Sequence, residues 1–387
     1  DKARQQPDKV KQVFQKIKTD GLGPTVNAVF NKLDQPLALG YSNFGVVIEV
    51  GKGVSGFAPG DRVVSNGNHA EVVCIPEHLC TKVPDEVDDV SAAFTVVSSI
   101  ALQGVRLVAP SLGETVAVMG LGLIGLITCQ LLKANGCRVI GFDFDTEKVA
   151  LAKTFGAEAH NLSTGLDPVE TALAFSGGHG VDSVIITAAT KSNDPIHQSP
   201  NMCRKRGKVV LVGVVGLDLS RDDFYKKEIT FQVSCSYGPG RYDPAYEKKG
   251  LEYPIGFVRW TEQRNFQAVL QLMAESRLNA KPLVSKVVPI QDALTVYGNI
   301  SGNAAALGIV LDFNREVDLK QTSIRLVPAS SHQGGEPRKA VLGFIGAGNY
   351  AKATLIPAFQ ESGAKLKTIV SAGGVSGTHL GKKSGFE

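Results

Sequence analysis

Gly120-Leu121-Gly122-Leu123-Ile124-Gly125 is the stretch of sequence that decides the fold. It directly follows the run Thr115–Met119, which predicts a buried strand, and it opens an apolar stretch over 123–135 that predicts a helix. Glycines at this spacing allow a tight turn, a close approach of the backbone to a pyrophosphate, and close packing of the helix on the strand. The first amides of such a helix point at the phosphates. The stretch therefore predicts a dinucleotide-binding βαβ unit, with cofactor contacts at Gly120, Gly122, Leu123, Ile124 and Gly125.

The next predicted strand, Arg138–Asp143, ends in a carboxylate. A carboxylate at this place accepts hydrogen bonds from a ribose 2′-hydroxyl and repels a 2′-phosphate, so NAD(H) is favoured over NADP(H). Lys148 could add a second contact to the adenosine ribose. The alternatives are that the loop is only a tight strand–helix turn, that Asp143 is an ordinary helix cap, and that Lys148 is a solvated helix lysine.

Further strand candidates alternate with helical stretches beyond this unit. Strands are predicted over 183–188, 208–212 and 229–233, with helices near 146–155, 168–175, 195–204 and 266–276. This alternation is typical of an α/β fold with a doubly wound parallel sheet. Such sheets bind ligands at the carboxyl ends of their strands, so two more groups of cofactor contacts are predicted: Thr187 and Ala188, and Val212, Gly213 and Val214.

The stretch before residue 109 has a different texture. Short β-rich runs over 44–50, 62–65 and 70–75 are separated by glycine turns, which predicts a small barrel-like domain. Two amphipathic helices are predicted within 1–33. Runs over 283–288 and 307–311 look like strands that return to this first domain.

Composition excludes several classes of protein. The formal net charge is only +4, and the basic excess lies near the two ends without interleaved aromatic residues, so nucleic-acid binding has little support. No apolar run has membrane-spanning length. The six cysteines are scattered and form no Cys-x-x-Cys pair, which suits a reducing cytoplasm. We therefore expect a cytoplasmic protein with a small-molecule substrate and no nucleic-acid or membrane partner; a homo-oligomer is left open.

Several motifs around the loop resemble those of the medium-chain, zinc-type alcohol dehydrogenase-like reductases. They cover about 36–313 and stand in the family's order: Gly45–Gly51, Gly60-Asp61-Arg62-Val63, His69–Val73, Gly120–Gly125, Gly178–Asp182 and Gly207–Gly213. The resemblance implies a GroES-like catalytic domain whose two sequence parts flank a Rossmann domain, with the substrate in the cleft between them.

A second glycine motif, Gly343-Phe344-Ile345-Gly346-Ala347-Gly348, follows a polar stretch and precedes another strand candidate over 365–370. It resembles the opening of a glucose–fructose oxidoreductase/inositol dehydrogenase domain. The two resemblances together imply a fragment of a bi-domain oxidoreductase associated with sugar metabolism. Five segments are expected: 1–108, the first part of an N-terminally truncated GroES-like domain; 109–280, the Rossmann domain; 281–313, the return to the catalytic domain; 314–338, a linker; and 339–387, the truncated start of a second Rossmann domain.

The sequence departs from the family at the metal site. Zinc-dependent members carry Gly-His-Glu where this chain reads Gly40-Tyr41-Ser42, and neither Tyr nor Ser is a usual zinc ligand. We therefore expect no zinc and no other metal site.

Without zinc, hydride transfer needs another group to stabilise the developing oxyanion. The hydroxyl of Tyr41 is one candidate, and the alternative is that Tyr41 only fills the vacated metal space. His69 is a candidate proton shuttle because its ordinary pKa lies near neutrality, although a satisfied surface histidine is the alternative. Thr95 and Ser98 could contact the nicotinamide ribose.

The expected activity is a zinc-independent, NAD(P)(H)-dependent hydride transfer to or from a carbonyl or alcohol; a sugar-derived substrate is left open. One alternative is a quinone- or enoyl-type reductase. Another is a non-catalytic cofactor-binding module that supports the second domain.

Overall fold

The structure, a computed structural model, describes residues 15, 17–19, 21, 25–26, 36–299, 306–313, 323–326 and 340–387. Its contacts divide the chain into two compact units. One unit is Leu39–Arg315, and the other combines Asp1–Ala38 with Glu316–Glu387. The helices predicted within 1–33 and the linker predicted over 314–338 lie almost entirely outside the described residues.

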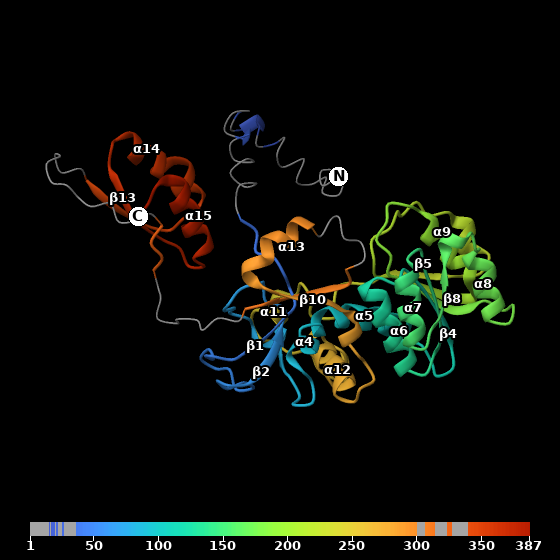
Figure 1. Cartoon of the computed structure of the whole chain (residues 1–387). Helices are drawn as coiled ribbons and strands as arrows, with labels where there is room; N and C mark the ends of the chain where they lie inside the picture. The colour runs from blue at the N-terminus through green and yellow to red at the C-terminus, as the bar shows by residue number, and fades with distance from the viewer. Residues whose placement is uncertain are drawn as a thin grey trace. The chain divides into compact units, whose positions relative to one another are not determined.

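A six-stranded parallel sheet forms one end of the unit Leu39–Arg315 (Figure 1). The strand order is β6-β5-β4-β7-β8-β9, so the chain moves outward from β4 in one direction and then returns to build the other half. This is the order of a doubly wound dinucleotide-binding sheet, as predicted. The strands are β4 (Thr115–Met119), β5 (Arg138–Asp143), β6 (Glu158–Asn161), β7 (Val181–Ile186), β8 (Cys203–Leu211) and β9 (Thr230–Val233).

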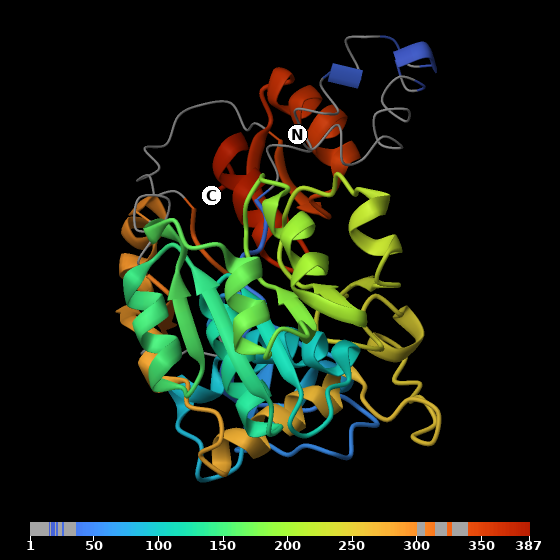
Figure 2. The ribbon, with the colours of Figure 1, turned by 90° about the vertical axis from the view of Figure 1, so that its right-hand side faces the viewer.

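Helices cover both faces of this sheet (Figure 2). Successive side chains of a strand point to opposite faces. Val116 and Val118 of β4 accordingly belong to one buried cluster, while Ala117 and Met119 belong to another. The first cluster includes residues of α5 (Thr95–Val108), α6 (Leu123–Ala134), α7 (Thr146–Thr154) and α12 (Glu262–Ala274), and the second includes residues of α8 (Pro168–Phe175) and α9 (Asp194–Met202). Because β4 is buried on both faces, its sequence is a continuous apolar run.

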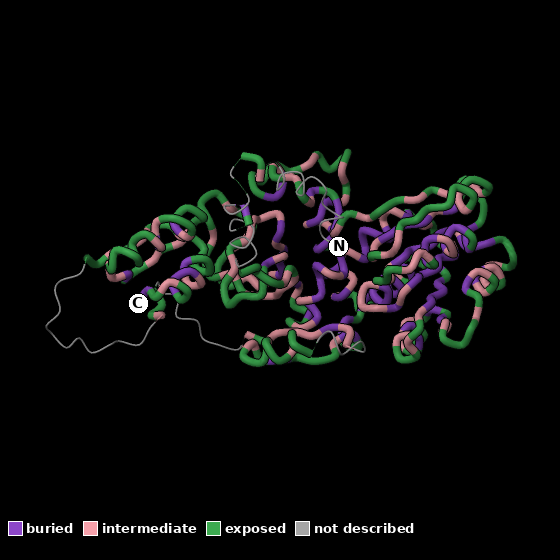
Figure 3. Tube along the Cα trace, turned by 90° about the horizontal axis from the view of Figure 1, so that it is seen from above, coloured by how far each residue is buried: buried purple, intermediate pink, exposed green. Residues whose placement is uncertain are grey.

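Buried residues concentrate in this helix-covered sheet, as the tube coloured by burial shows (Figure 3). All five residues of β4 and four of the six in β5 are buried. The sheet is therefore the rigid base that positions the loops at its carboxyl edge.

A smaller antiparallel sheet of three strands lies at the other end of the same unit (Figure 1). It contains β1 (Asn43–Val46), β2 (Arg62–Ser65) and β3 (Cys80–Lys82), and the helices α4 (Asp89–Ala92) and α11 (Pro244–Glu247) lie nearby. β10 (Val284–Pro289) and β11 (Gly308–Asp312) pair in parallel, and α13 (Ala293–Asn299) lies between them in the sequence.

One strand prediction in this part is wrong. Residues 70–75 form an irregular connection, and β3 at 80–82 completes the ladder instead. Glu71, Val72 and Cys74 are exposed, so the run has no hydrophobic face to hold it against the sheet.

The other unit holds a βαβ arrangement at its carboxyl-terminal end. β12 (Val341–Ile345) and β13 (Lys365–Val370) pair in parallel, joined by a π-helical turn (Ala351–Leu355) and α14 (Ile356–Glu361), and α15 (Val375–Ser384) follows. Gly346 has φ of +107°, a conformation that favours glycine. β13 matches its predicted bounds; the identity of this unit as the start of a second Rossmann domain stays a prediction.

Candidate functional site

The glycine loop connects the end of β4 to the start of α6, as predicted. Gly120 has φ of +97°, and a Cβ there would lie 2.7 Å from the backbone of Ala188. A Cβ at Gly125 would lie 1.9 Å from the carbonyl oxygen of Gly120. A Cβ at Gly122 would meet nothing within 4 Å, so the space beside this residue is open. Gly120 and Gly125 are thus required by the tight turn, whereas Gly122 faces free space that a pyrophosphate could occupy.

The amino-terminal end of α6 is also free to bind an anion. Its N-cap residue is Gly122, and no side chain of the described residues caps the helix there. The first amides of a helix lack partners within the helix and carry partial positive charge. A phosphate group is a suitable partner for them.

Asp143 lies at the end of β5, beside this loop. Its Oδ2 accepts a hydrogen bond from the Leu121 amide at 2.6 Å, and its Oδ1 accepts one from the Asp145 amide at 2.9 Å. A carboxylate has about four acceptor positions, so two bonds leave capacity for a ribose hydroxyl. Asp143 is not the cap of the following helix, because Asp145 caps α7.

Lys148 is held on α7 close to Asp143. Its Nζ lies 3.2 Å from Oδ2 of Asp145, and 18% of its side chain is exposed. A lysine on the surface of a helix forms the same kind of ion pair, so the alternative of a solvated helix lysine stays open. The predicted ribose contact of Lys148 stays a prediction.

The remaining predicted cofactor residues meet at the carboxyl edge of the sheet. The Thr187 hydroxyl donates to the Gly120 carbonyl oxygen at 2.5 Å, which ties the end of β7 to the loop. The Val214 amide donates to the Ala188 carbonyl oxygen at 3.0 Å, and a Cβ at Gly213 would lie 2.1 Å from the same oxygen. Val212 packs against Gly104 of α5, where a Cβ would lie 2.5 Å from its Cγ2. These segments therefore surround one place, next to the glycine loop.

His69 lies against the backbone of Gly40 in the smaller domain. A Cβ at Gly40 would come within 2.1 Å of the imidazole ring, and the His69 amide donates to the Leu39 carbonyl oxygen at 2.7 Å. Nδ1 of His69 lies 2.8 Å from the hydroxyl of Tyr297 on α13; the tautomer decides which group donates. Partial burial lowers the pKa of His69 and raises the pKa of Tyr297, which favours the neutral imidazole and the protonated phenol.

Tyr41 follows Gly40 and is 54% exposed. A side chain this exposed does not fill a closed space, so the alternative that Tyr41 merely replaces a buried metal is not supported. Ser42 is engaged elsewhere, because its hydroxyl donates to the Ala93 carbonyl oxygen at 2.6 Å.

Thr95 and Ser98 are both buried in α5. The Thr95 hydroxyl donates to the Ala92 carbonyl oxygen at 2.7 Å, within the turn that begins the helix. The Ser98 hydroxyl is buried and has no hydrogen-bond partner among the described residues. The ribose contacts of both residues stay predictions, and the existing bond of Thr95 makes Ser98 the more available donor.

The residues at the family's metal position are a poor donor set for zinc. Tyr41, Ser42 and His69 offer one imidazole and two hydroxyls, whereas catalytic zinc takes three ligands from His, Cys, Asp and Glu. In the described part of the chain, no group of three such residues is arranged to hold a metal ion.

A buried polar cluster joins the two ends of this unit. Tyr237 is 2% exposed, and its hydroxyl accepts a hydrogen bond from Nδ2 of Asn66 at 3.0 Å. The Asn265 side chain donates to the Tyr237 carbonyl oxygen at 2.9 Å. Glu262, fully buried at the start of α12, has no hydrogen-bond partner for either carboxylate oxygen among the described residues, and burial raises its pKa to about 8. The segment that carries Tyr237 is thereby joined to Asn66, which directly follows β2.

Two of these features have no signal in the local sequence: the pairing of Tyr297 with His69, and the burial of Glu262. A buried acid at the first position of an amphipathic helix looks like an ordinary first-turn glutamate, because Asp and Glu are common there.

Two parts of the chain are similar to families of dehydrogenase domains. Residues 12–85 match the family described as alcohol dehydrogenase GroES-like domain, and 124–248 match the family described as zinc-binding dehydrogenase. The protein named "Probable D-xylulose reductase A" from Arthroderma otae is 25% identical over 295 residues, covering 67% of this chain and 77% of that protein.

Solved structures show the same fold. The 2R,3R-butanediol dehydrogenase from Bacillus subtilis superposes with a TM-score of 0.59 at 24% identity, over 72% of this chain and 81% of that one. A candidate zinc-binding dehydrogenase from Sinorhizobium meliloti 1021 bound to NADP gives a TM-score of 0.56 at 24% identity, over 71% and 83% of the two chains. A short chain alcohol dehydrogenase (rspB) from Escherichia coli CFT073 with NADH gives 0.58 at 20% identity, over 71% and 83%.

Among the helices that the structure describes, none is both long and apolar enough to cross a membrane.

Proposed function

We propose zinc-independent hydride transfer for this chain, an NAD(P)-dependent oxidoreductase built from the GroES-like and nucleotide-binding domains of the zinc-type alcohol dehydrogenase-like reductases. The substrate is a carbonyl compound or the corresponding alcohol. NAD(H) is the preferred cofactor. His69, supported by Tyr297 and Tyr41, accepts or donates the proton of the substrate hydroxyl.

The geometry around Asp143 carries the cofactor preference. Its carboxylate accepts a hydrogen bond from the Leu121 amide of the glycine loop and still has free acceptor positions. A ribose 2′-hydroxyl can donate to those positions, whereas a 2′-phosphate would meet a negative charge. Gly122 and the uncapped start of α6 are suited to the pyrophosphate. When bound there, the nicotinamide dinucleotide supplies or accepts the hydride.

The side chains around Gly40 are assigned to the proton transfer that accompanies hydride transfer. The neutral His69 imidazole accepts the hydroxyl proton of an alcohol substrate, and the Tyr297 hydroxyl, 2.8 Å from Nδ1, orients the ring. Tyr41 donates a hydrogen bond to the substrate oxygen, which stabilises negative charge there. In the reverse direction, His69 returns the proton to the carbonyl oxygen.

Zinc independence rests on residue types. Tyr41 and Ser42 stand where the family's His and Glu would stand, and Ser42 is already bonded to Ala93. A small polyol or keto sugar is the proposed substrate class, supported by the name of the D-xylulose reductase relative. Cytoplasmic location and a small-molecule partner remain part of the same proposal.

Titration of NADH and NADPH tests the cofactor assignment. In the wild type NADH should bind more tightly than NADPH. Asp143→Asn removes the charge but keeps an acceptor oxygen, so the ratio of the two dissociation constants should move toward NADPH by about tenfold or more, since a hydrogen bond to a charged group contributes about 1.5–3 kcal/mol. Asp167→Asn, which changes the cap of another helix of the same sheet, α8, is the matched control. An unchanged ratio in Asp143→Asn would remove Asp143 from cofactor selection.

Turnover of a panel of polyols, keto sugars, quinones and enones tests the chemistry. For whichever substrate is turned over, Tyr41→Phe should lower kcat by about a hundredfold or more, the usual scale for loss of an acid–base or oxyanion contact. Tyr297→Phe should shift the acidic limb of the kcat–pH profile, because it changes the surroundings of His69. Tyr225→Phe, an exposed tyrosine on α10 (Arg221–Tyr225), should change neither. Turnover of quinones alone would favour the quinone-reductase alternative, and full activity in both variants would refute the proton assignment.

A further inference from the structure

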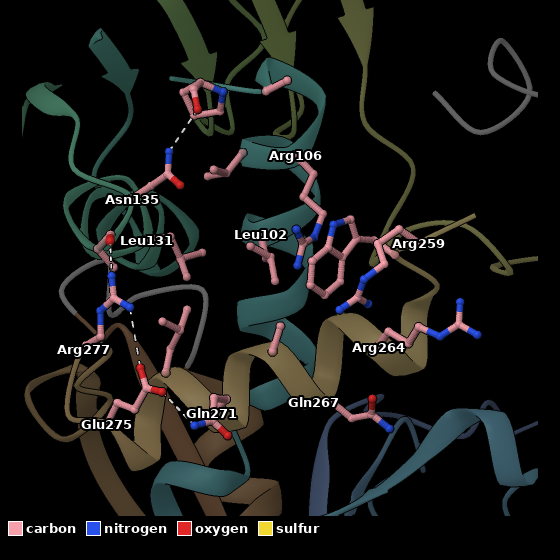
Figure 4. A pocket seen from close by; sticks show the side chains of 17 residues that line it. Leu102, Arg106, Leu131, Asn135, Arg259, Arg264, Gln267, Gln271, Glu275 and Arg277 are labelled. Carbon is pink, nitrogen blue, oxygen red and sulfur yellow. Dashed lines mark hydrogen bonds and ion pairs between the residues drawn. The ribbon is translucent and has the colours of Figure 1, made fainter. Parts of the chain in front are cut away.

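A cavity of about 760 Å³ lies between α5, α6 and α12, away from the glycine loop (Figure 4). Its apolar floor includes Leu102, Val105, Leu131 and Leu272. The volume is within the range of small-molecule sites, which combine an apolar lining with a few polar groups. The cavity lies at the carboxyl-terminal end of α6, whereas the loop is at the other end of this 12-residue helix, about 18 Å away.

Two guanidinium groups stack on one tryptophan at the rim of this cavity. The Cζ atom of Arg106 lies 3.4 Å from the centre of the Trp260 ring, and that of Arg259 lies 3.8 Å from it. Figure 4 shows Arg106 reaching down from α5 and Arg259 reaching in from the segment before α12. Stacking leaves the N–H edges of a guanidinium available for hydrogen bonds.

The other charged residues of the rim are already paired. Nη2 of Arg264 lies 3.3 Å from Oε1 of Glu252, and Nη1 of Arg277 lies 3.6 Å from Oε2 of Glu275. The charges of these two arginines are therefore compensated within the protein.

Arg106 and Arg259 are not compensated in this way. In the described part of the chain neither forms an ion pair with a carboxylate, and the one side-chain hydrogen bond of Arg106 goes from Nε to the neutral amide oxygen of Asn265 at 2.6 Å. Burial, and then the charge of Arg259, lower the pKa of Arg106 to about 10. The side chain remains charged at neutral pH, so two like charges face each other at the edge of a partly buried space.

We propose that this cavity binds a small organic anion, with a phosphate or carboxylate head held by Arg106 and Arg259 and an apolar body on the leucine floor. The planar fork of an arginine matches both kinds of head group. The anion removes the repulsion between the two guanidinium groups, and the leucines shield its body from water. This is a second site, and it does not depend on the function proposed above.

Fluorescence provides a direct test, because Trp260 is the single tryptophan of the chain. The full chain is titrated with phenyl phosphate, with benzoate and with neutral benzyl alcohol at constant ionic strength, with saturating NAD⁺ present so that the glycine loop is filled. We expect a saturable change in tryptophan emission with phenyl phosphate, benzoate or both, and no saturable change with benzyl alcohol. The tighter of the two anions identifies the head group.

Substitutions locate the site. Arg106→Gln and Arg259→Gln should each raise the dissociation constant of the bound anion about tenfold or more, as expected for loss of a charge-assisted hydrogen bond. Arg221→Gln is the matched control, because Arg221 also stacks on an aromatic ring, at 3.8 Å from the centre of Tyr225, but outside the cavity. Arg259 is exposed and makes no hydrogen bond with the residues that the structure describes, so its variant should fold even if loss of the Arg106–Asn265 bond destabilises the other. No saturable binding of either anion to the wild type, or unchanged affinity in Arg259→Gln, would overturn the proposal.

Discussion

Replacing Glu262 with glutamine should change how the stability of this protein depends on pH. Glu262 begins α12, is fully buried, and has no hydrogen-bond partner for its carboxylate oxygens among the described residues. Burial is the largest cause of its raised pKa of about 8; the charge of Glu247 adds to it, and Arg241 opposes it. The folded protein therefore holds a proton on Glu262 at neutral pH.

The sign of the effect follows from comparison with the unfolded chain, where the pKa is 4.5. Between pH 4.5 and about 8 the folded state binds a proton that the unfolded state has released, so the free energy of unfolding falls as pH rises. One pKa unit corresponds to about 1.4 kcal/mol, so this single group costs on the order of 5 kcal/mol over the whole interval. Glutamine resembles the protonated acid and does not titrate. The variant should gain about 1.4 kcal/mol on the wild type per pH unit and level off above pH 8.

Urea unfolding at a series of pH values measures this difference. The emission of Trp260, two residues before Glu262, reports on the same part of the molecule. Glu170→Gln is the control, since Glu170 is also in the first turn of its helix, α8, but is exposed; its curve should run parallel to that of the wild type. A difference between Glu262→Gln and the wild type that stays constant from pH 4.5 to 8 would refute the assignment of a buried, protonated acid.

Three other substitutions have effects that follow from contacts in and beside the sheet. Gly125→Ala should lower the melting temperature and abolish NADH binding, because the added methyl would lie 1.9 Å from the Gly120 carbonyl oxygen. Gly122→Ala should leave the melting temperature unchanged and weaken NADH binding only, because a Cβ there meets nothing within 4 Å. Equal melting temperatures for both variants would contradict this reasoning. Asp182→Asn should destabilise the fold more at pH 7 than at pH 3. Burial raises the pKa of the Asp182 carboxyl, but its hydrogen bonds, the largest from Arg204, outweigh burial and hold the pKa below its usual value, so the stabilisation is lost as pH falls. Thermal unfolding at the two pH values measures the change, and a pH-independent loss of stability would count against this reasoning.

The central strands could be predicted to the residue. β4 and β5 have the bounds that their apolar runs indicate, because both are buried on two faces and flanked by glycine. β6, Glu158–Asn161, was not predicted, since it lies at the edge of the sheet and carries polar residues. α5 was not predicted as a helix either; it contains buried Thr95, Ser98 and Ser99, which carry no helical apolar pattern.

The site was predictable where local sequence determines it. The turn at Gly120–Gly125 and the carboxylate after β5 are fixed by backbone geometry within one βαβ unit. The pairing of His69 with Tyr297 joins residues 228 positions apart, and no local pattern predicts which side chain α13 brings back to the smaller domain. The stacking of Arg106 and Arg259 on Trp260 likewise depends on tertiary packing, and neither residue spacing nor composition predicts it.

Zinc analysis of the purified, catalytically active protein, combined with turnover after treatment with a chelator, tests zinc-independent hydride transfer most directly. Tyr41 and Ser42 predict zinc far below one ion per chain and a turnover rate that the chelator does not change. One tightly held zinc per chain, with activity that is lost on its removal and restored by added zinc, would contradict the assignment of the chemistry to Tyr41, His69 and Tyr297.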